Sequence, residues 1–158
     1  MRALLAAVIA ASALGSACSS APSTFALTQA SVDPTYWCPG DAKDAPYDLH
    51  ATIAAHNGTS KTVTIESVNA EMRLAAVHGN WLEKVGSRYD AGSVPFTPST
   101  LAANSSATLK VTIPSACTSG KYAGEGSTSA DYVVTMHVAT SAGAFTITAG
   151  NKHEILAA

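Results

Sequence analysis

The chain has 158 residues, of which 47% are hydrophobic and 13% are charged, which excludes a charge-rich disordered chain and allows one ordinary domain with a short appendage. Its formal net charge of −2 provides no basic surface to attract nucleic acid, so we expect no nucleic-acid partner. Alanine contributes 31 residues, whereas Leu, Ile, Val and Phe together contribute 30, so any core combines small side chains with few large ones.

Residues 1–17 have the layout of a secretory signal peptide. Arg2 gives a basic start, residues 3–11 contain no polar side chain, and residues 12–17 are mostly small. The apolar run is shorter than the roughly 20 residues that a membrane-spanning helix needs. The alternative is a buried N-terminal helix of the domain. We therefore expect an exported protein whose signal peptide ends at Ala17.

The segment Leu14-Gly15-Ser16-Ala17-Cys18 resembles the lipobox of bacterial lipoproteins, in which a large aliphatic residue and two small residues precede a cysteine. Leu14 lies one place earlier than in that pattern. The resemblance implies that Cys18 is acylated and becomes the new N-terminus, and that its lipid anchors the protein to a membrane. The alternative is ordinary cleavage after Ala17 or Ala21, which would give a secreted protein. We therefore expect an exported protein that is either anchored in the cell envelope through Cys18 or secreted, with an envelope protein or glycan as its ligand.

The three cysteines form an odd set, and an exported protein with a spare thiol risks unwanted pairing. Acylation of Cys18 would remove the spare thiol and leave Cys38 and Cys117 to form one disulfide. These two cysteines are 79 residues apart, and closing so long a loop contributes about 4 kcal/mol through the unfolded state. The alternative is that both remain buried free thiols.

Residues 18–34 are rich in Ser, Thr, Ala and Pro, which predicts a flexible tether before a domain at 35–158. Alternating hydrophobic residues then predict a strand at 47–56, and Asn57-Gly58 favours a tight hairpin turn into a second strand at 61–68. Residues 69–77 alternate as a third strand, although their composition also suits a short helix.

Further along, residues 81–85 predict a short strand, and residues 86–104 predict the longest irregular segment of the domain. Four more strands follow from the alternation and turn signals, at 107–114, 130–140, 144–149 and 153–156. Seven or eight short strands without a long helix predict an all-β fold, an antiparallel β-sandwich.

This general pattern over residues 47–156 resembles the immunoglobulin-like or fibronectin-like domains of bacterial cell-envelope proteins. The segment Ala130-Asp131-Tyr132-Val133-Val134 is similar to the penultimate strand of such domains, in which a tyrosine forms a corner. The resemblance implies an immunoglobulin-like architecture. It does not imply a function, because one fold serves many functions.

Motifs of catalysis are missing from the sequence: it contains no G-x-S-x-G elbow, P-loop, G-x-G-x-x-G or C-x-x-C, and His153-Glu154 has no second histidine at Ala157. No spacing rule pairs its carboxylates for hydrolysis. We therefore expect no catalytic residues and no enzyme activity. A hydrolase with an unrecognised site is the third alternative.

An exported copper-binding protein with His and Met ligands is the main alternative function. His50 and His56 share a strand face, but they are about 20 Å apart and cannot hold one ion. Met136 and His137 are adjacent and point to opposite faces. A site would need His137 together with His50 or His56 across strands. The default is surface or half-buried imidazoles, so we expect no bound metal and no other cofactor.

Aromatic and basic side chains near the long irregular segment form the candidate binding patch: Trp81, Arg88, Tyr89 and Phe96. The alternative, which we favour for the tryptophans, is that Trp81 and Trp37 pack in the core or against the disulfide. The function expected overall is binding or a structural role in the envelope.

Overall fold

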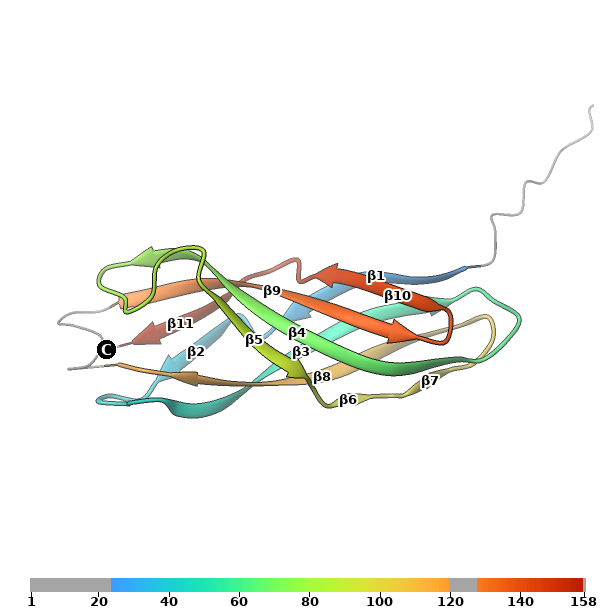
Figure 1. Ribbon diagram of the computed structural model, residues 1–158, viewed down its shortest axis with the longest axis horizontal. Coiled ribbons are helices and arrows are strands. Elements are labelled where there is room, and N and C mark those ends of the chain that lie inside the picture. Colours follow the sequence, from blue (N-terminus) through green and yellow to red (C-terminus); the bar gives the residue numbers. More distant parts are fainter. Residues whose placement is uncertain (1–23, 120–127, 158) are drawn as a thin grey trace, which may run out of the picture.

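The computed structural model describes residues 24–119 and 128–157, so the predicted signal peptide and Cys18 lie outside the described residues. Two β-sheets pack face to face and give an elongated sandwich (Figure 1). No helix in the described part of the chain is long and apolar enough to span a membrane. The predicted all-β sandwich is confirmed.

One sheet has four strands, in the order β1 (Phe25–Val32), β3 (Ala45–Asn57), β8 (Ser105–Cys117) and β6 (Phe96–Thr97). The other has seven. Its main path runs through β2 (Thr35–Cys38), β11 (His153–Ala157), β9 (Thr128–Thr140), β4 (Val63–His78) and β5 (Arg88–Ser93). β10 (Gly143–Thr148) also pairs with β9, and β7 (Thr100–Leu101) pairs with β4.

This strand order is that of an immunoglobulin-like domain, whose strands A, B, E and D form one sheet and whose strands C, F and G form the other. β1, β3, β8 and β6 take the places of A, B, E and D. β4 and β9 take those of C and F, and β10 with β11 form a last strand broken in two. The pairing is antiparallel except between β2 and β11, which run parallel.

The described residues contain eleven strands where the sequence predicts seven or eight. The first strand is divided because the chain crosses from one sheet to the other between Val32 and Thr35. The last strand is divided where it meets this crossing: the Asn151 side chain accepts a hydrogen bond from the Val32 N–H and donates one to the Val32 carbonyl. The sequence predicts none of the strands β1, β2, β5, β6 and β7, and the last three occupy residues predicted to be irregular. Conversely, the strands predicted at 61–68 and 69–77 form the single strand β4, and the strand predicted at 81–85 is wrong because these residues lie in the loop between β4 and β5.

The predicted tether is wrong over Phe25–Val32, because these residues form β1 and pair with β3. Phe25 is buried against Phe145, with ring centroids 5.0 Å apart, and Val32 is buried in the core. The Ser- and Thr-rich composition of this segment is compatible with an edge strand whose other face is exposed.

β4 combines two predicted strands. In the first the buried residues are at odd-numbered positions, and in the second they are at even-numbered positions. Val63 and Ile65 are buried at odd positions, whereas Val68, Ala70 and Met72 are buried at even positions. A bulge in the pairing with β9 between Ile65 and Ser67 inserts one residue and shifts the register. Both halves therefore face the core, and the short-helix alternative for 69–77 is excluded.

The predicted hairpin at Asn57-Gly58 is wrong, because β3 and β4 belong to different sheets. Asn57 is fully buried, and its side-chain amide nitrogen lies 2.8, 3.1 and 2.9 Å from the carbonyl oxygens of Lys61, Leu101 and Ala102. Asn57 thus organises a loop that carries the chain across the sandwich, which a two-residue turn could not do.

Cys38 and Cys117 form a disulfide with Cα atoms 5.9 Å apart, as predicted. Cys38 ends β2 and Cys117 ends β8, so the bond joins the two sheets. The core around it is as sparse in large residues as the composition indicates. Its largest fully buried side chains are Leu49, Ile53, Met72, Leu74, Leu101, Leu109, Ile113 and Met136, together with His153, Val68, Val111 and Val134.

A candidate binding cleft between the two sheets

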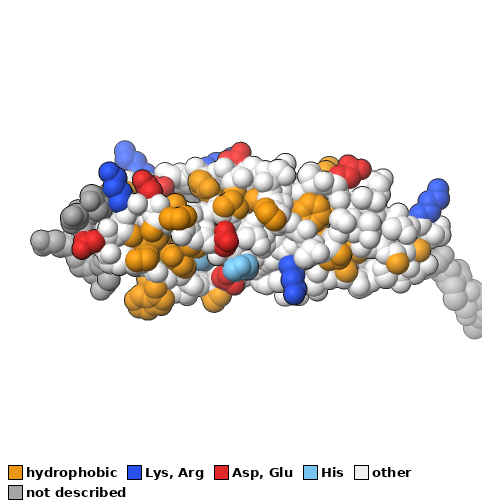
Figure 2. Space-filling view, turned by 90° about the horizontal axis from the view of Figure 1, so that it is seen from below, with side chains coloured by type: hydrophobic (Ala, Val, Ile, Leu, Met, Phe, Trp, Pro, Cys, Tyr) orange, Lys and Arg blue, Asp and Glu red, His pale blue; other side chains and the backbone are white. Residues whose placement is uncertain are grey.

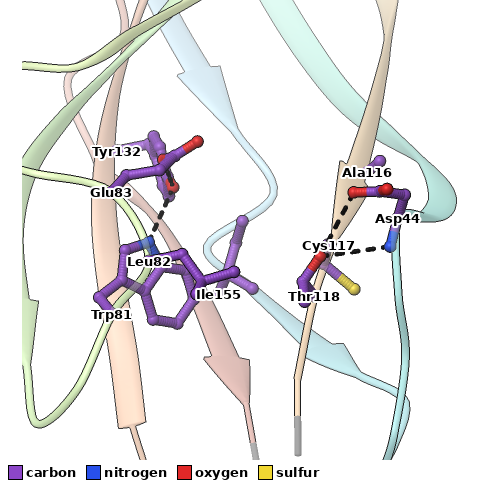
Figure 3. A pocket seen from close by; sticks show the side chains of 9 residues that line it. All are labelled: Asp44, Trp81, Leu82, Glu83, Ala116, Cys117, Thr118, Tyr132 and Ile155. Atoms are coloured by element: carbon purple, nitrogen blue, oxygen red, sulfur yellow. Dashed lines mark hydrogen bonds between the residues drawn. The ribbon is translucent and has the colours of Figure 1, made fainter. Parts of the chain in front are cut away.

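Two adjoining cavities lie between the sheets near the end of the sandwich at which β8 finishes, and the first is shown in Figure 3. Their volumes are about 170 and 220 Å³. Both are lined by Asp44, Glu83, Ala116, Tyr132 and Ile155. Because they share these walls, we treat them as one feature, the tip cleft. Trp81 and Thr118 line its first cavity, and Tyr89 and Ser115 line the second.

One wall of the tip cleft is the loop between β4 and β5. The Trp81 Nε1–H donates a hydrogen bond to the Tyr132 hydroxyl at 3.2 Å, and this hydroxyl donates to Glu83 Oε2 at 2.7 Å. The Gly86 N–H donates to the Leu74 carbonyl at 2.8 Å, with Gly86 at a φ of 96° that suits glycine. The loop is therefore fixed to the strands by its backbone, and its Trp and Glu side chains are oriented by one tyrosine.

The opposite wall combines Asp44 with the end of β8. The Asp44 N–H donates to Thr118 Oγ1 at 3.2 Å, and the Ser119 N–H donates to the Ala42 carbonyl at 2.9 Å. Asp44 has a φ of 51°, which an aspartate tolerates better than most residues. These bonds, together with the adjacent disulfide at Cys117, hold the Asp44 wall to β8.

One edge of β8 faces the tip cleft. From residue 113 onward, this edge pairs with no other strand among the described residues. β6 covers β8 only at Lys110 and Val111, and the Thr112 N–H donates to the Pro95 carbonyl. Backbone groups alternate in direction along a strand, so those of residues 114 and 116 point to this same edge. The Tyr89 hydroxyl donates to the Pro114 carbonyl at 3.1 Å, in agreement with that direction. The Ala116 N–H and C=O therefore face the cleft.

The charge of the tip cleft comes from two carboxylates on opposite walls, Asp44 and Glu83 (Figure 3). Neither cavity is lined by Lys, Arg or His. Burial is the main cause that raises the pKa of Tyr132 well above its usual value, and the hydrogen bond to Glu83 is the second. Tyr132 therefore remains a neutral donor, and the cleft is negative at neutral pH.

Two of the four residues predicted as a binding patch line the tip cleft, namely Trp81 and Tyr89. Arg88 is exposed on β5, and its Nη1 lies 3.8 Å from Glu71 Oε2. Phe96 is on β6 in the other sheet and lines a separate cavity of about 420 Å³ beside His50. The four residues thus do not form one patch.

Sequence reasoning missed Asp44 and Glu83 as members of the cleft. Asp44 precedes the first predicted strand, at 47–56, and Glu83 falls within the strand predicted at 81–85, which is wrong because these residues form the loop between β4 and β5. Nothing in their spacing indicated that two loops nearly 40 residues apart would face each other.

Large exposed hydrophobic side chains gather at the tip-cleft end of the molecule: Trp37, Leu82, Val85 and Tyr89. Figure 2 shows that hydrophobic groups are concentrated toward this end of the visible face. Trp37 is 72% exposed, so the expectation that it packs in the core or on the disulfide is wrong. The neighbouring residue Cys38 points inward, and alternation along β2 therefore directs Trp37 outward. Trp81, by contrast, packs partly against the core.

The histidines of the copper hypothesis lie apart and are engaged with other groups. Nδ1 of His50 is 3.0 Å from Asp33 Oδ2, that of His56 is 2.9 Å from Ser106 Oγ, and that of His137 is 3.0 Å from Thr146 Oγ1. Within the described ranges, no three His, Cys, Asp or Glu side chains are grouped so that they could hold a metal ion.

Comparison with known proteins gives no family for the chain, since no family model and no curated protein matches it. Among solved structures, it is similar to the ASH/PapD-like domain 7 of human CEP192, with a TM-score of 0.32, 10% identity, and coverage of 96% of this chain and 98% of that one. It is also similar to AggA, the major subunit of aggregative adherence fimbriae type I from Escherichia coli, with a TM-score of 0.31, 9% identity, and coverage of 85% and 95%. The immunoglobulin-like assignment therefore rests on the strand order described above.

Proposed function

We propose that this chain is an exported, lipid-anchored cell-envelope protein that binds a ligand in the tip cleft and catalyses no reaction. The observation that carries the binding role is the cleft itself, which is hollow, lined by the aromatic residues Trp81, Tyr89 and Tyr132, and carries the carboxylates of Asp44 and Glu83. Apolar walls with a few convergent polar groups are typical of ligand sites. The Cys38–Cys117 disulfide supports export, because such bonds persist in oxidising compartments.

The position of the cleft suits an anchor at Cys18. Only six residues separate Cys18 from Phe25, which begins β1, and they span at most about 25 Å when fully extended. β1 begins at one end of the sandwich, and β8 finishes at the other (Figure 1). A 13-residue strand is about 43 Å long, so the cleft would face away from the membrane, where a ligand can reach it.

The anchor is tested by replacing Cys18 with Ser. Wild-type protein should sediment with membranes and carry the mass of attached acyl chains, whereas Cys18→Ser should be released without lipid. Membrane association of Cys18→Ser, together with a wild-type mass that contains no lipid, would contradict the anchor.

The ligand site is tested by placing a photo-crosslinking amino acid at Leu82, which is exposed and lines the cleft, and at Thr108 as control. Thr108 is exposed on β8 away from the cleft. A defined envelope protein or glycan should be captured from position 82 and not from position 108. Equal capture from both positions, or none from position 82, would contradict binding in the cleft.

A further inference from the structure

We infer that the ligand of the tip cleft is an extended peptide segment that inserts a lysine or arginine side chain between Asp44 and Glu83, against Trp81. This inference rests on the proposed function, because it names the ligand class of the same cleft. Three features support it: the charge of the two walls, the aromatic surface between them, and the free edge of β8.

The two carboxylates of the tip cleft favour a positively charged ligand group. Asp44 and Glu83 lie on opposite walls of both cavities, and no basic side chain lines either cavity. The Tyr132 hydroxyl donates to Glu83 Oε2, and among the described residues no hydrogen bond to Oε1 is present, so Oε1 can accept one from a ligand. An ammonium or guanidinium group between the two walls would interact with both carboxylates, and hydrogen bonds between charged partners are stronger than those between neutral ones.

The aromatic surface fits the same ligand. The Trp81 N–H is already used by Tyr132, so the indole offers its ring rather than a donor. An aromatic ring attracts a cation placed over its face, and tryptophan does so most strongly. Ala116 and Ile155 add apolar wall that can contact the methylene stem of a lysine or arginine side chain.

The free edge of β8 favours a peptide over an isolated amine. The Ala116 N–H and C=O face the cleft and can pair with an extended backbone, as in ligands that add a strand to a sheet. Pro114 has no N–H, and Tyr89 occupies its carbonyl, so this pairing stops after one residue. Such a short pairing fixes the register of the ligand and places one of its side chains in the cleft.

A neutral glycan fits these features less well. It would shield two carboxylates from water without supplying a compensating charge, which costs free energy. It would also leave the Ala116 backbone groups without an extended partner. A glycan is therefore the competing outcome of the experiment.

The probe is the alternating peptide Ac-AKAKAKAK-NH2, with Ac-AQAQAQAQ-NH2 and neutral oligosaccharides as comparisons. The chain contains two tryptophans, so Trp37→Phe leaves Trp81 as the only tryptophan reporter. The full chain, purified as cells process it, is titrated in this background. The lysine peptide should change Trp81 fluorescence saturably, with an affinity that falls as salt is raised. The glutamine peptide should bind at least about tenfold more weakly.

Charge is tested by the double variant Asp44→Asn and Glu83→Gln, which keeps shape and hydrogen-bonding oxygens. We expect its affinity for the lysine peptide to fall about tenfold. The matched control is Asp48→Asn with Glu66→Gln, two acidic residues exposed outside the cleft, which should keep wild-type affinity. Thermal unfolding of each variant shows that the fold is intact.

The backbone contact is tested by Ala116→Pro, which removes the edge-facing N–H without touching the ladder to β3. Peptide affinity should fall, whereas the affinity for lysine methyl ester should not. An unfolded Ala116→Pro protein leaves the charge variants as the deciding measurement.

Three results would overturn the inference: no fluorescence response to the lysine peptide, equal affinity for the glutamine peptide, or equal affinity in the charge variant and its control. If a neutral oligosaccharide instead changes Trp81 fluorescence and is captured from position 82, the inference fails and the proposed function survives. If no ligand is captured at position 82, both fail.

Discussion

Tyr132 on β9 donates a hydrogen bond of 2.7 Å to Oε2 of Glu83, which lies in the loop between β4 and β5. The same hydroxyl accepts the Trp81 N–H, so one buried tyrosine orients two residues of the tip cleft. In many immunoglobulin-like domains the corresponding tyrosine bonds to backbone. Here it bonds to side chains that shape a candidate ligand site.

Tyr132→Phe should keep the fold and disturb the cleft. The substitution leaves the partly buried Trp81 N–H without its partner, which costs about 1–2 kcal/mol of unfolding free energy. In the Trp37→Phe background, Trp81 emission should shift to longer wavelength as the indole becomes more exposed. Tyr89→Phe is the control: the Tyr89 hydroxyl donates to the Pro114 carbonyl and not to Trp81, so this emission should stay unchanged. An unchanged Trp81 spectrum in Tyr132→Phe would contradict the orienting role.

Loss of the disulfide should strongly destabilise the sandwich. The bond closes a 79-residue loop and joins the two sheets, so Cys38→Ser with Cys117→Ser should cost about 4 kcal/mol. For a domain of this size that lowers the melting temperature by about 8–16 °C. Cys18→Ser is the control and should melt as wild type does. A drop of less than about 2 °C in the double variant would show that the sheets do not depend on the bond.

Stability should fall at mildly acidic pH because of His153. This residue is 1% exposed; its Nδ1–H donates to the Asp33 carbonyl at 2.8 Å, and its Nε2 accepts from the Tyr47 hydroxyl at 3.0 Å. Burial lowers the pKa of His153 below 6.5, so the folded state binds fewer protons than the unfolded state in acid. Its contribution is complete above about pH 6.5 and is lost as the pH falls below that value.

Urea unfolding at several pH values between 7.5 and 5 measures this dependence, which can reach about 1.4 kcal/mol per pH unit for one group. His153→Gln should lower the overall stability and flatten the slope. His137→Gln, at an exposed position of β9, should keep the wild-type slope. An equal slope in His153→Gln and wild type would assign the acid sensitivity to other groups.

Alkaline unfolding should depend on Tyr47. Burial raises the pKa of Tyr47 to about 12 from 10, and its ring stacks on Tyr36 with centroids 3.8 Å apart. The folded state therefore resists loss of the proton, so the contribution of Tyr47 is complete below pH 10 and falls between pH 10 and 12. Tyr47→Phe should weaken the pH dependence in that interval, measured by denaturant unfolding. A residual slope should remain because the pKa of Tyr132 is raised as well.

Asn57→Ala should destabilise the crossing loop between the sheets. It leaves the carbonyls of Lys61, Leu101 and Ala102 without their shared donor, at a cost of about 2–3 kcal/mol. Asn69→Ala, at an exposed position of β4, should change stability by less than about 0.5 kcal/mol. Urea unfolding compares the two variants, and equal stabilities would refute the role of the buried amide.

The fold class was predictable because alternation with a period of two reports which side chains face a core. Leu49, Ile53 and Leu109 were assigned to buried faces in this way and are buried. The Cys38–Cys117 pair followed from counting cysteines in a chain with an export signal. Both inferences use local or pairwise information that the sequence contains directly.

The sheet assignment was not predictable in the same way. Alternation says which face of a strand is buried but not which strand lies beside it, so Asn57-Gly58 looked like a hairpin although β3 and β4 lie in different sheets. The bulge near Glu66 likewise hid one long strand as two shorter ones. Edge strands such as β1 bury few large side chains and carry a weak signal.

By itself, then, the sequence determined that this chain forms a β-sandwich with a thin core, closed by one long-range disulfide. Only the tertiary structure decided that Asp44, Glu83 and Ala116 meet around one cleft, at the end of the sandwich away from the start of β1. The physical reason is that strand periodicity is a local property of the backbone. A cleft depends instead on how the sheets twist and where loops distant in sequence come together.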